Sequence, residues 1–220
     1  MPTPISYLID DAALAIGDPN KGRVSPTHWL SFYNRATREL CQKANVLKYE
    51  GEFNLEARAE YRYPAEMTCF KGVEVTLTAD DDDSWFFLKE MFEDEFREYT
   101  DRTYPIDALP SHYFAEANGF FLIPRPQATL SNCGLMHYFG LPDRVSDPTV
   151  NMQTDDTTQD LITRRMIIFG MRARNRLVEA AAEYATWKDD VESLMDKLDD
   201  RSQDWRSSLA PRRRRYSGMN

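Results

Sequence analysis

A change of sequence periodicity between residues 25 and 64 constrains the fold more than any other feature of the chain. Ser25 and Pro26 predict a helix start, because a serine hydroxyl can cap a free amide and proline lacks an amide that the first helical turn would leave unpaired. Apolar side chains then recur every three or four residues, as on one helical face: Trp29, Phe32, Ala36, Leu40, Ala44 and Leu47. We therefore predict a helix over 26–47.

After Gly51 the pattern changes to strict alternation. Apolar residues from Phe53 onward alternate with polar residues from Asn54 onward, as in a strand with one buried and one solvated face. Pro64 ends the alternation, because proline cannot donate a hydrogen bond to a neighbouring strand. We predict a strand over 52–63, directly after the helix.

The other elements are predicted from the same two periodicities and from turn residues. Asn118-Gly119 lies between two apolar runs, which is the strongest short signal for a hairpin. The expected elements are a helix over 4–16, a strand over 73–78, a helix over 84–99, the hairpin over 113–123, a strand over 135–141, and one long helix or a helical pair over 157–206.

This order predicts an α+β fold with segregated helices. We expect a helical bundle with long C-terminal helices, plus a small central antiparallel β-sheet and an extended C-terminal tail. The expected organisation is one domain over 1–206, with a β-rich insertion at about 50–142, followed by a basic arm over 207–220. The apolar face of 26–47 should pack against the long C-terminal helices.

Charge and composition limit the partners of the 220-residue chain. The net charge of −9 disfavours general binding to phosphate backbones. We expect no membrane contact, because no apolar run approaches the roughly 18 residues that span a bilayer, and no secretory signal, because the N-terminus lacks a basic region. Cys41, Cys69 and Cys133 are odd in number and widely spaced, which predicts buried thiols in a reducing compartment.

No catalytic or cofactor motif is recognisable, so we predict a protein that is not an enzyme and uses no cofactor or metal. His28, His112 and His137 have no histidine or cysteine at zinc-ligand spacing. Four consecutive aspartates could still bind a divalent ion and serve a metal-dependent hydrolase: Asp80, Asp81, Asp82 and Asp83. They lack the spaced oxygen ligands and the glycine of a calcium loop, which favours a solvated acidic turn.

The sharpest charge feature is the run of four arginines near the C-terminus: Arg212, Arg213, Arg214 and Arg215. Arginines on an extended arm can grip nucleic-acid phosphates or an acidic protein, and a solvated tail is a third possibility. A nucleic-acid-binding accessory protein is therefore an alternative function. The acidic balance of the rest of the chain favours an arm that docks on a protein partner.

Residues 29–41 resemble the entry helix of the phage head–tail adaptor family, also called connector or head-completion proteins. The shared pattern is W-x-x-F-x-N-x-A-x-x-E-L, followed by an alternating strand that ends in tyrosine and proline, here Tyr63 and Pro64. A later hairpin closed by Pro124 and Pro126 is also similar. The resemblance extends over most of 25–205.

This resemblance implies a structural virion protein of the neck, made in the host cytoplasm. Such a protein forms a ring with itself, usually of twelve copies, between the portal protein and the tail or nozzle proteins. DNA would pass through its channel without specific binding. The arm with Arg212, Arg213, Arg214, Arg215 and Tyr216 would dock on the portal, and the charged face of 26–47, with Arg35, Arg38 and Glu39, would contact the neighbouring subunit.

Overall fold

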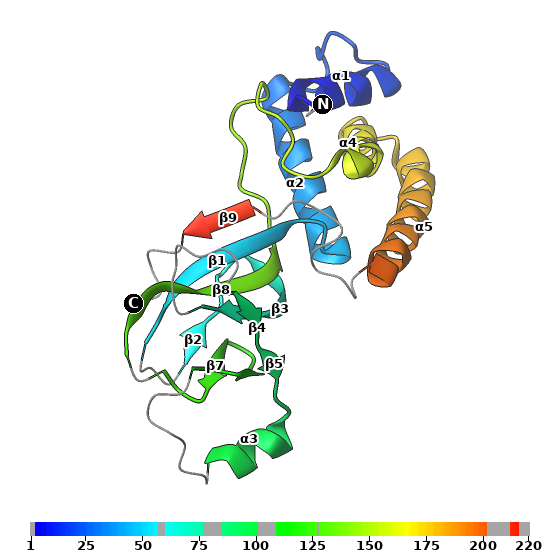
Figure 1. Ribbon diagram of the computed structural model, residues 1–220. Helices are drawn as coiled ribbons and strands as arrows, with labels where there is room; N and C mark the ends of the chain where they lie inside the picture. The colour runs from blue at the N-terminus through cyan, green and yellow to red at the C-terminus, as the bar shows by residue number, and fades with distance from the viewer. Residues whose placement is uncertain are drawn as a thin grey trace. The chain divides into compact units, whose positions relative to one another are not determined.

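The computed structural model describes residues 3–56, 60–76, 85–100, 109–126, 128–201 and 212–215. The chain divides into two compact units (Figure 1). The helical unit comprises residues 1–47 and 140–210, and the β unit comprises residues 48–139 and 211–220. The predicted α+β class is confirmed, although helices and strands are only partly segregated, since one helix lies among the strands and one strand follows the last helix. The expected separation of an arm over 207–220 from a domain over 1–206 stays a prediction.

The helical unit contains α1 (Ile5–Ala15), α2 (Pro26–Ala44), α4 (Gln159–Ala173) and α5 (Leu177–Arg201), with a short 3₁₀ turn, η2 (Asp156–Thr158), before α4. The start of α2 is as predicted: the Ser25 hydroxyl accepts a hydrogen bond from the His28 amide, and Pro26 occupies the first turn. The helix ends at Ala44, earlier than predicted, because Asn45 adopts a left-handed conformation with φ 49°.

Helix α4 is the centre of the helical unit and contacts α1, α2 and α5. The buried Trp29 packs edge-on against Phe32, which in turn contacts Phe169 of α4, so the apolar face of α2 meets the C-terminal helices as expected. A side chain at Gly170 would place its Cβ 2.8 Å from the Trp29 ring. This glycine therefore allows α2 and α4 to approach closely.

The described part of the segment predicted over 157–206 forms a helical pair, which is one of the two arrangements predicted. The break lies at Asn175, whose φ of 58° is left-handed, a conformation that asparagine tolerates better than most residues. The indole of Trp187 on α5 is buried and donates a hydrogen bond to the Leu161 carbonyl of α4 over 2.9 Å. This bond fixes the two helices side by side.

The β unit contains two sheets instead of the single sheet predicted. The five-stranded sheet has the order β4 (Phe86–Phe87), β3 (Met67–Val75), β8 (Leu130–Gly140), β1 (Lys48–Leu55) and β9 (Arg212–Arg215). The four-stranded sheet has the order β2 (Tyr61–Arg62), β7 (Gly119–Ile123), β6 (His112–Ala115) and β5 (Lys89–Glu90). The prediction of purely antiparallel pairing was wrong, since β1–β9 and β5–β6 are parallel.

The predicted strand over 52–63 is two strands in different sheets. The alternation itself is right: Phe53, Leu55 and Tyr61 are buried, whereas Asn54 is exposed. The strand breaks because the Tyr61 hydroxyl accepts from the Glu56 amide over 2.8 Å and donates to the Glu56 carbonyl over 2.9 Å. A side chain thus replaces the neighbouring strand at this residue.

The helix predicted over 84–99 was wrong in its first half. Residues 86–87 and 89–90 are short strands, and the helix α3 covers Glu93–Thr100. The buried Leu88 lies between the two strands, and its amide donates to the Val73 carbonyl over 2.9 Å. The aromatic spacing had suggested a helix, but pairing with β3 and β6 decides the structure here. The predicted hairpin is confirmed as β6 and β7.

Candidate interaction surface of the helical unit

A surface pocket of about 210 Å³ lies beside α2. Side chains of α2 form one wall, and the segment that follows β8 forms the other. We call it the basic pocket, because three of its seven lining residues are arginines: Ser31, Asn34, Arg35, Arg38, Pro142, Asp143 and Arg144. A concave site of this kind is suited to a carboxylate or phosphate group.

The side chain of Asn34 joins the two walls of the pocket by hydrogen bonds. Its side-chain amide donates to the Leu30 carbonyl over 3.0 Å and to the Val145 carbonyl over 2.9 Å. Its side-chain oxygen accepts from the Val145 amide over 2.8 Å. The two bonds to Val145 place the neighbouring Arg144 next to the arginines of α2. The asparagine belongs to the pattern that carries the family resemblance, whereas Arg144 had no recognisable signal in a loop-like sequence.

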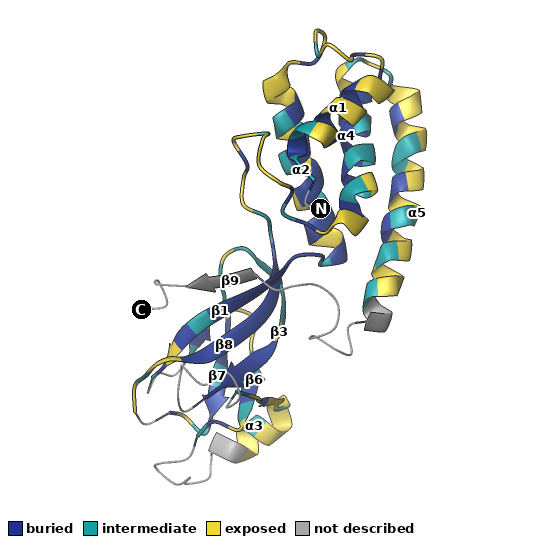
Figure 2. Ribbon diagram, turned by 45° about the horizontal axis from the view of Figure 1, so that its top comes forward, coloured by how far each residue is buried: buried dark blue, intermediate teal, exposed yellow. Residues whose placement is uncertain are grey.

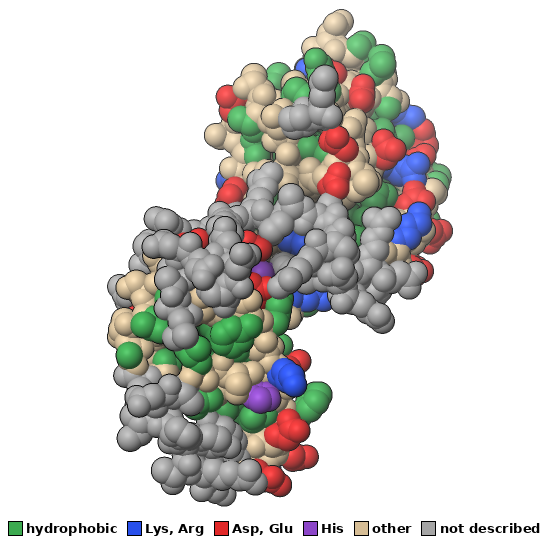
Figure 3. Space-filling view, in the orientation of Figure 1, with side chains coloured by type: hydrophobic (Ala, Val, Ile, Leu, Met, Phe, Trp, Pro, Cys, Tyr) green, Lys and Arg blue, Asp and Glu red, His purple; other side chains and the backbone are tan. Residues whose placement is uncertain are grey.

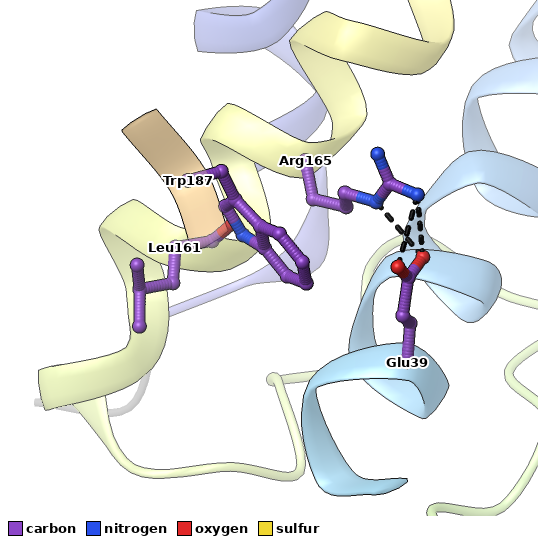
Figure 4. Close-up of polar contacts among 4 residues, drawn as sticks. All are labelled: Glu39, Leu161, Arg165 and Trp187. Atoms are coloured by element: carbon purple, nitrogen blue, oxygen red, sulfur yellow. Dashed lines mark hydrogen bonds and ion pairs between the residues drawn. The ribbon is translucent and has the colours of Figure 1, made fainter. Parts of the chain in front are cut away.

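The three residues predicted to contact a neighbouring subunit have different surroundings. Arg38 is exposed at the pocket, and the Arg35 guanidinium lies 4.5 Å from the centre of the Phe169 ring while also lining the pocket. Glu39 is bound within its own chain to Arg165 (Figure 4). The structure therefore brings Arg35 and Arg38 together at one surface. Their contact with another subunit stays a prediction.

The Glu39–Arg165 pair is a structural element of the helical unit. The carboxylate of Glu39 accepts bonds from Arg165 Nε at 2.8 Å and from Nη2 at 2.7 and 3.0 Å. The guanidinium also lies over three aromatic rings, at 4.4 Å from Phe169, 4.6 Å from Tyr184 and 5.0 Å from Trp187. A bidentate ion pair on aromatic faces joins α2, α4 and α5.

The arginine segment is a strand in the part of the chain that the structure describes. The backbone of β9 pairs in parallel with β1, so that Arg213 is in register with Glu50 and Arg215 with Glu52. A run of identical basic residues has no apolar alternation, and the sequence therefore did not predict this strand. Tyr216 lies outside the described residues, and docking of the segment on a portal stays a prediction.

The three histidines occupy different environments. His28 and His112 place a ring nitrogen 2.8 and 2.9 Å from the hydroxyls of Ser25 and Ser111, respectively. His137 is buried in the five-stranded sheet, with Nδ1 3.6 Å from Glu50 and Nε2 3.5 Å from Glu74. Three strands bring this cluster together, so spacing along the sequence could not reveal it.

No group of three or more His, Cys, Asp or Glu side chains within the described residues is arranged to hold a metal ion. No described helix is long and apolar enough to cross a membrane. The four aspartates from Asp80 to Asp83 lie outside the described residues. The predicted burial of thiols is confirmed for Cys41 and Cys133, and burial raises the pKa of Cys41 to about 12, whereas Cys69 is half-buried.

The basic pocket, the edge strand β9 with its four arginines, and the ion pair between α2 and α4 are features of the class of binding and assembly proteins. This class agrees with the comparison with known families. A family model described as SU10 adaptor protein matches residues 3–215. The chain therefore belongs to the SU10 adaptor protein family, which confirms the resemblance to phage head–tail adaptors.

Family membership makes the chain a viral protein, a phage adaptor and a component of the virion. An adaptor family indicates a structural, non-enzymatic role in contact with other virion proteins. A search of curated proteins found no match.

Proposed function

We propose that the protein is the head–tail adaptor of its phage and joins the portal protein to the tail or nozzle proteins at the neck. Copies of the chain assemble into a ring, with twelve as the expected number, and the ring lines the channel through which DNA leaves the capsid. The observation that carries the proposal is the match to an adaptor family over 3–215, which includes both the helical unit and the β unit.

The two units supply separate surfaces for the neighbours of such a ring. The helical unit offers the basic pocket, with Arg35 and Arg38, as the contact between subunits. The β unit would face the tail-side proteins. The arm, with Arg212–Arg215 and Tyr216, would bind the portal. The net charge of −9 suits a channel that DNA must traverse without adhering to its wall.

Glu39 would contribute to the subunit contact only indirectly. Its carboxylate is bound by Arg165, so it would act at the subunit contact by fixing α2 and α4, and not as an independent ligand. Arg35 and Arg38 would make the direct contact.

Light scattering of the purified full-length chain tests the proposal, first alone and then with purified portal rings of the same phage. We expect a monomer alone and, on the portal, a complex whose mass fits a ring of this chain. A chain that remains monomeric and unbound at micromolar concentrations of both proteins would overturn the proposal.

The arm is tested by deleting residues 211–220. Loss of portal binding in a chain that stays folded is expected, and unchanged portal binding would remove the arm from the proposal. Duplex DNA serves as the control ligand, because the alternative function predicts DNA affinity that falls steeply with salt and disappears with the same deletion.

A further inference from the structure

We propose that the basic pocket beside α2 receives the acidic outer face of α5 from a second copy of this chain. The inference rests on the ring proposed above and adds which two surfaces meet when neighbouring subunits assemble. It begins with α5, whose exposed side has a distinctive composition.

Helix α5 buries one face and exposes the opposite one. Ala180, Trp187 and Val191 are buried against the helical unit. The face opposite to them follows the same helical period and is exposed (Figure 2). We call it the outer stripe, which consists of three small apolar residues followed by three acids: Val178, Ala182, Ala185, Asp189, Glu192 and Asp196.

Two other carboxylates of the same helix form ion pairs within the chain. Asp190 pairs with Arg164, and Glu179 pairs with Arg176. Among the described residues, Asp189, Glu192 and Asp196 have no such ion pair. Basic side chains do occur along this side of the helical unit (Figure 3), but the helical period places Lys188 and Lys197 at the margins of the stripe and not within it.

The basic pocket has the complementary charge. Arg38 and Arg144 are exposed, and neither forms an ion pair with another residue that the structure describes. The lining of the pocket contains three arginines and one carboxylate, that of Asp143, so its net charge is positive. Arginine suits such a contact, because its planar guanidinium can bind a carboxylate through two parallel hydrogen bonds.

The position of the two surfaces favours a ring. Helices α2 and α5 lie on either side of α4 in both views of the helical unit (Figures 1 and 2). A contact between two different surfaces leaves one copy with a free stripe and the other with a free pocket, and such heterologous contacts generate closed rings or filaments. A self-complementary dimer would use the same patch twice and stop at two copies.

A second copy fits the pocket better than nucleic acid. The chain carries a net charge of −9, which opposes approach to a phosphate backbone, whereas the stripe offers carboxylates at spacings of three and four residues along one helix. The small side chains of Ala182 and Ala185 also let a neighbouring surface approach this helix closely.

Charge reversal on each surface separately tests the pairing. The pocket variant carries Arg38→Glu and Arg144→Glu, and the stripe variant carries Asp189→Lys and Glu192→Lys. For each variant alone, we expect the affinity of assembly on portal rings to fall at least about tenfold relative to the unmodified chain, because like charges then meet at every contact. An equal mixture of the two variants should assemble again, since each reversed surface finds its reversed partner in the other chain.

Matched controls change the same number of charges elsewhere on the exposed surface. Arg23→Glu with Arg62→Glu controls for the pocket variant, and Asp11→Lys with Glu98→Lys controls for the stripe variant. Both controls should assemble like the unmodified chain. Circular dichroism checks the fold of every variant. A variant that does not fold is replaced by a neutral one, in which the introduced Glu becomes Gln and the introduced Lys becomes Asn or Gln.

The outcomes separate this inference from the proposed function. If the unmodified chain does not assemble on the portal, the proposed function fails. If it assembles and either surface variant does so equally well, the function stands and this inference is overturned. If both variants fail and their mixture also fails, the two surfaces do not pair with each other, which overturns it as well.

Discussion

The helical unit and the β unit bury charged groups in different ways. In the helical unit each buried charge has a dedicated set of partners: Arg165 binds Glu39, and the Asp18 carboxylate accepts three backbone amides. In the β unit the strands β1, β3 and β8 bring Glu50, Glu74 and His137 into one cluster. In the first unit Arg165 and Glu39 join helices and Asp18 binds the backbone before α2, whereas the charges of the second unit are shared between three strands.

The two units are specified by interactions of different range along the sequence. The helical unit is assembled from local patterns and a few interhelical contacts, so one substitution at a contact should affect the helices of this unit and not the strands of the β unit. In the β unit, neighbouring strands come from distant parts of the sequence, so a single residue contributes to several contacts at once. Four substitutions test this contrast.

Trp29→Ala should produce the largest loss of stability. Trp29 is fully buried and contacts both Phe32 and the α4 glycine, so truncation leaves a large cavity between α2 and α4. We expect the free energy of unfolding to fall by about 3–5 kcal/mol, measured by urea unfolding with circular dichroism. Phe92→Ala is the control, because Phe92 is 72% exposed and should change stability by less than about 0.5 kcal/mol.

Hydrogen exchange resolved by mass spectrometry would locate the effect of Trp29→Ala. Faster exchange confined to α1, α2, α4 and α5 is expected if the helical unit holds itself together. Equal acceleration in β1, β3 and β8 would contradict the contrast between the units.

Gly170→Ala should destabilise the protein, although this change usually stabilises a helix interior by about 1 kcal/mol. The added Cβ would lie 2.8 Å from the Trp29 ring and 3.0 Å from Ile16, so α2 or α1 must move away from α4. We expect a loss of about 1–3 kcal/mol from overpacking, measured by thermal unfolding. A rise in Tm would show that the contact between α2 and α4 is looser than described.

The sequence predicted the helical unit better than the β unit, and the reason is the range of the interactions. The start of α2 depends on Ser25 and Pro26, which are adjacent, and it was predicted correctly. Two sheets cannot be distinguished from one by alternation alone, because Leu55 and Tyr61 keep the same period in different sheets. The sequence also contains no signal for the bond between the Tyr61 hydroxyl and the Glu56 backbone, at which the predicted strand breaks.

The candidate surface was predicted in part for the same reason. Arg35 and Arg38 share a helical face, so local period identified them as one exposed group. Arg144 reaches this group only because Asn34 holds its loop through bonds across 111 residues of sequence. The strand pairing of Arg212–Arg215 with β1 is equally non-local, since the partner lies at the other end of the chain.

Tyr61→Phe tests the bonds between Tyr61 and the end of β1, with a smaller expected effect. The ring stays stacked on Phe120, at 5.3 Å between centres, while both bonds from the hydroxyl to the Glu56 backbone are lost. We expect a decrease of about 1–2 kcal/mol in the free energy of unfolding, measured by urea unfolding. Tyr7→Phe is the control, because Tyr7 is 61% exposed on α1. Equal stability of the two variants would assign the strand break to some other cause.

Asp18→Asn should have the smallest effect and should appear as a change in pH dependence. Burial acts to raise the pKa of Asp18, but hydrogen bonds from the amides of Val24, Arg23 and Gly22 outweigh it and hold the pKa below its ordinary value of 3.8. A carboxyl with a lowered folded pKa contributes stability above its unfolded pKa, and this contribution is lost as the pH falls through the folded pKa.

The unmodified chain should therefore lose this increment on acidification below about pH 4. Asp18→Asn should be less stable at neutral pH and should lose less stability between neutral and acid pH, as followed by thermal unfolding at a series of pH values. Asp11→Asn, at an exposed position of α1, should keep the pH profile of the unmodified chain. Identical pH profiles for the two variants would mean that the turn between α1 and α2 does not depend on the Asp18 carboxylate. Of the two buried charged groups discussed for the helical unit, only the Arg165–Glu39 pair would then contribute to stability.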